Sequence, residues 1–112
     1  MPKNYRIKYT YSARDDILRM RKYILQTFKY HELAKGFTNR IQKAARELKI
    51  LPNGYSTIGF QYRGYDIYLK PYRTYLLFYT IDEDAGIVTI LRVLKDGMNW
   101  QYILKRWLIE NG

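Results

Sequence analysis

The chain of 112 residues has the length of a single domain with one hydrophobic core, and we expect one domain over residues 1–112. Hydrophobic residues make up 47% of the sequence, which is enough to build that core and excludes wholesale disorder. Cys is absent and His occurs once, which excludes disulfide scaffolds, zinc fingers, iron–sulfur sites and thiol catalysis. We therefore expect neither a metal nor a cofactor.

The sequence contains no segment typical of membrane insertion or export. No apolar stretch approaches the roughly 18 residues needed to cross a bilayer. The N-terminal run Met-Pro-Lys-Asn lacks the apolar residues of a signal peptide. These features predict a cytoplasmic protein without membrane contact.

The charge is strongly positive and unevenly distributed. The sequence holds 20 Lys and Arg against 10 Asp and Glu, a formal net charge of +10. Residues 1–51 hold 13 of the basic residues and 4 of the acidic ones, whereas residues 52–94 hold 4 of each. Such a charge favours a polyanionic partner or an acidic protein partner over simple solubility. We expect the first half of the chain to form the contact surface.

The first half predicts a strand followed by a helical hairpin. Residues 5–11 alternate between apolar or aromatic and polar side chains, which indicates a half-buried strand. Ser12, with Asp15 three residues on, is a candidate N-cap. Apolar residues then recur at spacings of three and four, at Ile17, Met20, Ile24 and Phe28 and again at Leu33, Phe37, Ile41, Ala44, Leu48 and Leu51. This pattern predicts two amphipathic helices that break near Tyr30 and His31 and stop at Pro52.

The second half predicts three strands and a last helix. Residues 65–69, 75–81 and 87–94 are rich in β-branched and aromatic residues, and residues 82–86 favour a hairpin turn. An apolar stripe from Trp100 to Leu108 indicates a helix capped by Asn99. We therefore predict an α+β fold in which the N-terminal helical hairpin packs on one face of a small antiparallel sheet, with a C-terminal helix. The first strand must pair with a strand of the second half.

The residues support few kinds of catalysis. His31 is interpreted as a helix-boundary residue, because no Ser/His/Asp constellation exists for it to join. The acidic run 82–84 falls in a turn, and the glycines lack the spacing of a phosphate loop. One set of groups near the sheet could act on a phosphate without a metal ion, as in a ribonuclease that uses the 2′-hydroxyl: Arg63, Lys70, Arg73, Arg92, Lys95 and Tyr102.

The chain resembles toxins of the RelE/ParE superfamily, the growth-inhibiting half of type II toxin–antitoxin modules. The resemblance covers nearly the whole chain. It rests on the order of elements, the Tyr-Arg-Ile-Lys-Tyr-Thr-Tyr-Ser-Ala entry at residues 5–13 and the Leu-Pro-Asn-Gly helix end at residues 51–54. Its strongest pieces are Tyr-Leu-Leu-Phe-Tyr-Thr-Ile-Asp at residues 75–82 and Val-Thr-Ile-Leu-Arg-Val-Leu-Lys at residues 88–95. The resemblance implies the α+β fold that periodicity also predicts.

The superfamily has two activities. RelE-type members cleave mRNA on the ribosome, using basic residues on the sheet and a C-terminal Tyr. Asp66 and Tyr68 stand at two positions that are usually Lys in these nucleases, and Leu76 stands where RelE-type and YoeB-type nucleases have Arg. An acidic side chain repels the phosphate that a Lys attracts. If the chain is such a metal-independent endoribonuclease, Arg73, Lys95 and Tyr102 are the catalytic candidates.

ParE-type members poison DNA gyrase and are not enzymes. Their last strand ends in an Arg-Val-Leu-His-x-x-Met-Asp-like run, and residues 92–99 are similar, with Lys for His and Asn for Asp. The resemblance therefore favours a ParE-like gyrase poison, with ribosome-dependent mRNA cleavage as the alternative. A non-toxic RNA-binding domain is a third option. The candidate contacts to the target or its phosphates are Arg63, Lys70, Arg92 and Asn99.

Both toxin activities imply the same second partner, a cognate antitoxin. Such a protein would be acidic and would lay an amphipathic segment across the hairpin and the sheet, where complementary charge speeds capture. The candidate antitoxin-binding residues on the two predicted helices are Arg19, Lys22, Arg40 and Lys43.

Overall fold

The computed structural model describes residues 4–29 and 31–112, so Tyr30, where the helical break was expected, lies outside the described residues. The elements in chain order are β1 (Arg6–Tyr9), α1 (Tyr11–Phe28), α2 (His31–Arg46), two short 3₁₀ turns (Glu47–Lys49 and Pro52–Gly54), β2 (Ser56–Tyr62), β3 (Tyr65–Tyr72), β4 (Tyr75–Asp82), β5 (Ile87–Lys95) and α3 (Trp100–Asn111). His31 opens α2 and is exposed, as expected for a helix-boundary residue.

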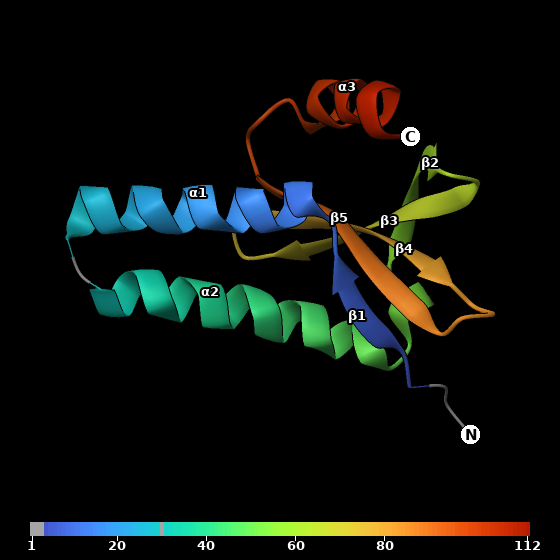
Figure 1. Ribbon diagram of the computed structural model, residues 1–112, viewed down its shortest axis with the longest axis horizontal. Coiled ribbons are helices and arrows are strands. Elements are labelled where there is room, and N and C mark those ends of the chain that lie inside the picture. Colours follow the sequence, from blue (N-terminus) through green and yellow to red (C-terminus); the bar gives the residue numbers. More distant parts are fainter. Residues whose placement is uncertain (1–3, 30) are drawn as a thin grey trace.

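The five strands form one sheet in the order β1-β5-β4-β3-β2 (Figure 1). The first strand pairs with the second half, as predicted, but it runs parallel to β5, with Arg6 opposite Ile87. The other neighbouring strands are antiparallel. A parallel pair requires a long connection, which the helical hairpin and the three intervening strands supply. The sheet is therefore mixed rather than wholly antiparallel.

Strand β2 is an element that the sequence pattern did not predict. This strand contains Gly59 at a φ of 84°, and its pairing with β3 is irregular between Thr57 and Gln61. Glycine lowers strand propensity and marks such irregularities, which hides the strand from a pattern search. Strand β3 also extends beyond the predicted residues 65–69 and includes Pro71. The pairing of β3 with β2 ends where Leu69 lies opposite Ser56, and Pro71 lies two residues beyond that point. The absent N–H of Pro71 therefore removes no hydrogen bond to β2.

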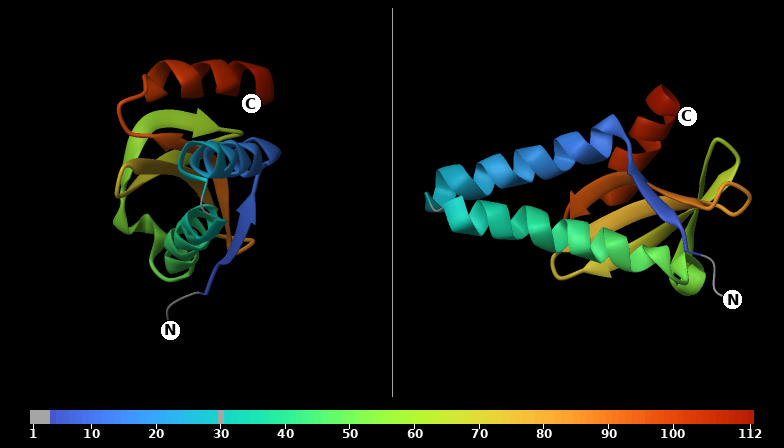
Figure 2. Two further views of the ribbon diagram at one scale, coloured as in Figure 1. Left: turned by 90° about the vertical axis from the view of Figure 1, so that its left-hand side faces the viewer. Right: turned by 60° about the horizontal axis from the view of Figure 1, so that its bottom comes forward.

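The sheet is covered on both faces, with the α1–α2 hairpin on one and α3 on the other (Figure 2). Alternate residues of the central strands divide between two cores. Leu77 and Tyr79 of β4 pack under the hairpin with Phe37 and Ile41 of α2. Leu76 and Phe78 belong to the core beneath α3, which also holds Leu104 and Trp107. Burial on both faces explains the near-continuous apolar runs of β4 and β5.

The far end of the helical hairpin extends beyond the sheet (Figures 1 and 2). Ile17, near the start of α1, is 8% exposed, whereas Phe28 at its end is 54% exposed. Leu33, in the first turn of α2, is 44% exposed. The apolar stripes of both helices are therefore buried over the sheet and exposed at the tip, where none of the described strands lies beneath them.

Helix α1 begins two residues earlier than the sequence predicts. Thr10, not Ser12, is its N-cap, and the Thr10 Oγ1 accepts a hydrogen bond from the Ala13 backbone N–H at 3.0 Å. The same hydroxyl donates to the Leu91 carbonyl of β5 at 2.7 Å. Ser12 instead accepts a 2.6 Å hydrogen bond from the Trp107 indole. At the last helix, Asn99 caps α3 as predicted.

Candidate functional site

An open groove of about 630 Å³ lies between α1, the ends of β4 and β5, and α3. We call it the apolar groove, and we define it by six of its lining residues: Met20, Tyr23, Ile24 and Phe28 of α1, Met98 of the β5–α3 loop and Ile103 of α3. Three of these side chains remain accessible, with Tyr23 61%, Phe28 54% and Met98 45% exposed. In a hydrophilic surface, such a concave apolar strip is typical of a binding site.

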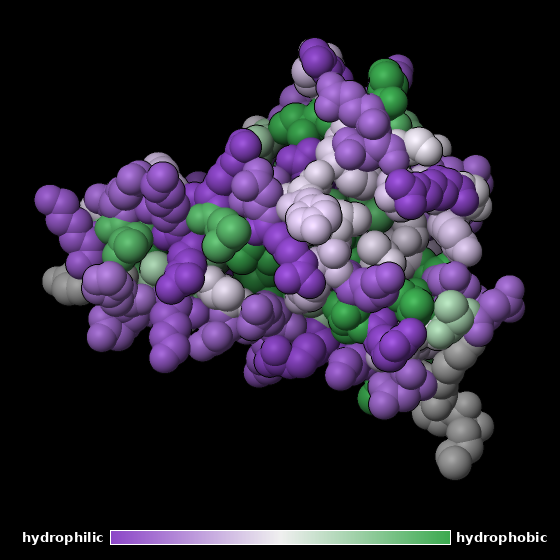
Figure 3. Space-filling view, in the orientation of Figure 1, coloured by the Kyte–Doolittle hydropathy of each residue, from purple (hydrophilic) through white to green (hydrophobic). Residues whose placement is uncertain are grey.

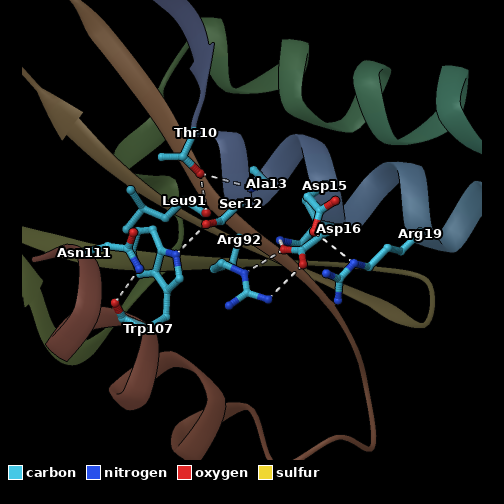
Figure 4. Close-up of polar contacts among 11 residues, drawn as sticks. Thr10, Ser12, Ala13, Asp15, Asp16, Arg19, Leu91, Arg92, Trp107 and Asn111 are labelled. Carbon is cyan, nitrogen blue, oxygen red and sulfur yellow. Dashed lines mark hydrogen bonds and ion pairs between the residues drawn. The ribbon is translucent and has the colours of Figure 1, made fainter.

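The floor of the apolar groove contains an internal ion pair (Figure 4). Both carboxylate oxygens of Asp16 accept hydrogen bonds from the Arg92 guanidinium, each at 2.8 Å. Asp16 also accepts a 2.9 Å hydrogen bond from the Val93 backbone N–H. The two side chains are only 10% and 16% exposed. This bidentate pair fixes α1 on the end of β5 and shapes the groove.

Arg92 therefore has a structural partner that the sequence analysis did not identify. We expected Arg92 to contact the target or a phosphate, but its Nε and Nη2 are engaged by Asp16. A signal for Asp16 was present in the sequence. Ala13, Asp16, Ile17 and Met20 occur at the spacing of one helix face, so a carboxylate stands within the stripe that faces the core. A charge in that position requires a partner.

Lys70, another expected phosphate contact, also points inward. Its residue is 4% exposed, and its Nζ donates to the Ala44 carbonyl at 2.7 Å and to Glu47 at 2.9 Å. The hydrogen bond and charge of Lys70 lower the pKa of the Glu47 carboxyl. A cation at the carboxyl end of α2 also complements the helix dipole. Lys70 thus joins β3 to the end of α2 and offers no open donor surface.

The other two expected target contacts lie at surface turns. Arg63, in the β2–β3 turn at a φ of 52°, lies 4.9 Å above the ring of Tyr62. Its Nη2 donates to the Asn111 carbonyl at 3.5 Å, a weak contact with the end of α3. Asn99 accepts from the Tyr102 backbone N–H as the cap of α3. Both residues are exposed, and their role in target binding stays a prediction.

The three catalytic candidates do not line one pocket. Arg73, in the β3–β4 turn, lies at the same end of the sheet as Lys95, where the Asp96 N–H donates to the Thr74 carbonyl. Lys95 lines the apolar groove, whereas Tyr102 lines a smaller cleft of about 280 Å³ on the α3 side of Arg92. The Tyr102 hydroxyl accepts a 3.2 Å hydrogen bond from Arg106.

The expected antitoxin-binding residues all lie on exposed helix surface. Arg19 lines the apolar groove and forms an exposed ion pair with Asp15 at 2.9 Å (Figure 4). Lys22 follows on α1, and Arg40 and Lys43 lie on α2. Along the hairpin, the surface is largely hydrophilic with small hydrophobic patches (Figure 3).

Two negative findings concern the described part of the chain. Residues 4–29 and 31–112 contain no group of three or more His, Asp or Glu side chains placed to hold a metal ion. The same residues form no helix with the length and apolar character required for a membrane span.

The fold is shared with chains from three solved toxin–antitoxin systems. The structure superposes on a chain from the chromosomal ParDE system of Pseudomonas aeruginosa with a TM-score of 0.63 and 14% identity, covering 82% of this chain and 96% of that one. The RelBE2 toxin–antitoxin complex of Mycobacterium tuberculosis gives a TM-score of 0.56 and 22% identity, with coverage of 86% and 95%. The archaeal RelE–RelB complex of Pyrococcus horikoshii gives 0.55 and 16%, with coverage of 84% and 97%.

The sequence assigns the chain to a particular family within this class. Residues 7–100 match the family described as the ParE toxin of the type II toxin–antitoxin system parDE. The chain belongs to this family, which confirms the resemblance to the RelE/ParE superfamily and the predicted α+β fold. A comparison with curated protein sequences gives no significant match.

Proposed function

We propose that this ParE-family toxin acts by binding a protein target, as a poison of DNA gyrase, and does not cleave RNA. The observation that carries the proposal is that two of the basic residues near the sheet form ion pairs within the protein. Arg92 and Lys70 are held by Asp16 and by Glu47, each at less than 3 Å, and are committed to the fold. A catalyst of RNA cleavage needs cations aimed at the phosphate in the transition state.

The remaining candidates give little support to a nuclease site. Lys95 and Tyr102 open into different clefts on either side of Arg92, and the described residues of both clefts include no His. General acid–base catalysis requires a proton carrier within hydrogen-bond reach of the reacting group. An apolar groove with accessible aromatic and Met side chains is better suited to grip another protein.

Ribosome-dependent RNA cleavage stays the second candidate function. One observation favours it: Arg73 and Lys95 are brought to one end of the sheet by the 2.7 Å hydrogen bond between Asp96 and Thr74. A phosphate bound there could meet both cations. On this alternative, Arg73→Ala or Lys95→Ala abolishes toxicity while the protein remains folded.

We also propose that an acidic antitoxin neutralises the chain by covering the apolar groove with an amphipathic segment. The groove has an apolar wall on α1, while Arg19 and Lys95 lie at its border. Acidic side chains on the polar face of a bound helix or strand would meet these two cations. The net charge of +10 adds long-range attraction.

The order in which cellular syntheses fail tests the gyrase proposal. The chain is induced alone in bacteria, and incorporation of labelled thymidine and labelled amino acid is followed over the first minutes. Gyrase poisoning stops thymidine incorporation first, and Arg73→Ala and Tyr102→Phe variants behave like the unchanged chain. Earlier loss of amino-acid incorporation, removed by either variant, would contradict the proposal and support RNA cleavage. Normal growth during induction would contradict both toxin activities.

A further inference from the structure

A second cleft, of about 350 Å³, lies beside the open edge of the sheet. Its lining comes from Arg6, Ile7 and Tyr9 of β1, from Gln42 and Arg46 of α2, and from Lys49 in the 3₁₀ turn after α2. Among the described strands, β1 is at the edge of the sheet and pairs only with β5, and its outer edge borders this cleft. The apolar groove shares none of these residues.

Two arginines, Arg14 and Arg46, lie beside Tyr9 of this cleft. The Arg14 guanidinium lies 5.9 Å from the centre of the Tyr9 ring. Arg46 lines the same cleft as Tyr9. Burial raises the pKa of the Tyr9 hydroxyl, and the charges of Arg46 and Arg14 oppose that rise. We use the name basic cleft for three cations that line this cleft, Arg6, Arg46 and Lys49, together with Arg14, which lies outside the lining but beside the Tyr9 ring.

The cations of the basic cleft have no acidic partner in the described part of the chain. All four residues are exposed, and residues 4–29 and 31–112 contain no ion pair that includes any of them. Four like charges held together in this way repel one another, and a polyanion relieves that repulsion. Hydrophilic residues also predominate along the helical hairpin in Figure 3, whereas the region over β1 is mixed.

We propose that the basic cleft binds the phosphate backbone of double-stranded DNA without reading its sequence. Arginine forks and a lysine bind phosphate oxygens, and duplex DNA carries one charge for about every 1.7 Å of its axis. Arg46 caps the 3₁₀ turn that contains Lys49, so the rise between the two residues is about 6 Å, close to two steps of the roughly 3.4 Å rise per phosphate of one strand.

The surroundings of the cleft favour a duplex over a single strand or a peptide. Single-strand binding relies on bases stacked on open aromatic rings, but Tyr9 is half-buried and packs against the core under the hairpin. A peptide would need apolar pockets, and Ile7 is only partly exposed here. The cleft therefore offers charge and hydrogen-bond donors, which suit a backbone contact. This inference does not depend on the identity of the toxin's protein target.

The salt dependence of DNA binding tests the proposal. A fluorescent 20-base-pair duplex (about two helical turns) is titrated with the full chain, and binding is followed by anisotropy at several NaCl concentrations. Four phosphate contacts predict a slope of log K against log[salt] of about −3.6, or an affinity loss of about 150-fold between 50 and 200 mM salt. The double variant Arg46→Gln/Lys49→Gln is expected to reduce the slope to about −1.8.

A matched variant distinguishes the cleft from net charge. Arg21→Gln/Lys105→Gln removes one Arg and one Lys from exposed sites on α1 and α3 and should keep the original slope. A charge-conserving variant, Arg46→Lys/Lys49→Arg, should also keep it and controls for misfolding. The proposal is overturned if both Gln variants reduce the slope equally, if the charge-conserving variant loses it, or if an RNA duplex of the same length binds more tightly.

Discussion

The apolar groove and the basic cleft lie against the same helical hairpin but differ in what they offer a partner. The groove contacts α1 and has accessible Tyr23, Phe28 and Met98 above the neutralised Asp16–Arg92 pair. The cleft contacts α2 and β1 and presents cations that no acidic side chain of the described residues neutralises. In the groove, the charges of Asp16 and Arg92 pair with each other and stabilise the fold, so the apolar side chains are the surface available for binding. In the cleft, the charge itself is available.

This difference separates two kinds of binding. Buried apolar anchors supply most of the affinity of a protein interface and control dissociation. Exposed cations supply attraction that depends on salt and speeds association. We therefore expect a protein partner at the groove to tolerate salt better than a polyanion at the cleft.

The largest effect is expected from the ion pair in the floor of the groove. Asp16→Ala leaves the Arg92 charge and the Val93 N–H without their partner, and should lower the free energy of unfolding by about 3–5 kcal/mol. Urea denaturation measures the loss. Asp15→Ala is the matched control, because its pair with Arg19 is exposed at 55% and 80% and should contribute about 0–1 kcal/mol. Equal losses would show that Asp16 does not anchor the groove.

The apolar wall of the groove should dominate antitoxin binding. Tyr23→Asp places a charge on the wall and should weaken the complex at least about 30-fold, or about 2 kcal/mol. Leu18→Asp is the control, because Leu18 lies on the same helix and is 58% exposed, close to the 61% of Tyr23, but does not line the groove. Isothermal titration calorimetry with the cognate antitoxin compares them. A similar loss for both variants would remove the groove from the interface.

A comparison of two lysines separates cations that hold the fold from cations available to a partner. Lys70→Met removes charged hydrogen bonds to Ala44 and Glu47 and should cost about 1.5–3 kcal/mol in unfolding free energy. Lys49→Met, on the exposed cleft, should change it by about 0.5 kcal/mol or less. Thermal or urea unfolding of both variants measures the two changes in unfolding free energy. If Lys49→Met is equally damaging, the cleft is part of the stabilising structure and not an open binding surface.

The pH dependence of the unfolding free energy should also reveal the Lys70–Glu47 pair. Because the pairing lowers the pKa of Glu47 in the folded state, the unfolded chain binds more protons as the pH falls. The stabilisation is present above the ordinary carboxyl pKa and is lost as the pH decreases through the lowered folded value. Between about pH 6 and pH 3, the unfolding free energy should fall less in Glu47→Gln than in the unchanged chain. Parallel curves would contradict this role for Glu47.

The smallest effect is expected when charges of the basic cleft are removed and binding of the antitoxin at the apolar groove is measured. Arg46→Gln/Lys49→Gln should slow antitoxin association a few-fold at low salt and leave the dissociation rate nearly unchanged, because these charges lie outside the groove. Stopped-flow kinetics at two salt concentrations measures both rates. A large increase in dissociation rate would mean that the antitoxin also covers the cleft.

Much of the fold could be predicted from the sequence because local patterns encode it. Alternation at Tyr5, Ile7 and Tyr9, the hairpin stripes over the sheet and the apolar runs of the last strands each reflect burial against a neighbour. The strand predicted over residues 5–11 ends at Tyr9, because Tyr11 begins α1 and is 92% exposed. The failures arise where tertiary contacts decide. Thr10 rather than Ser12 caps α1 because Thr10 also bonds Leu91 and Ser12 meets Trp107, and neither neighbour is near in sequence.

The candidate site was less predictable for the same reason. Arg92 and Lys70 have the residue types of phosphate-binding groups, and their spacing along the chain does not show that Asp16 and Glu47 lie beside them. Pairs such as Asp16 and Arg92 are 76 residues apart, so only the fold brings them together. In contrast, the exposure of Arg19, Lys22, Arg40 and Lys43 followed from their position opposite the apolar stripes.

The proposal that the chain binds DNA gyrase and does not cleave mRNA is tested most directly with purified components. The chain is added to DNA gyrase with a plasmid substrate and, separately, to ribosomes that are translating a defined mRNA. The account predicts that DNA cleaved by gyrase accumulates, that the mRNA stays intact, and that the cognate antitoxin reverses the effect on gyrase. Cut mRNA with gyrase unaffected would contradict it and would make Arg73, Lys95 and Tyr102 the residues to change next.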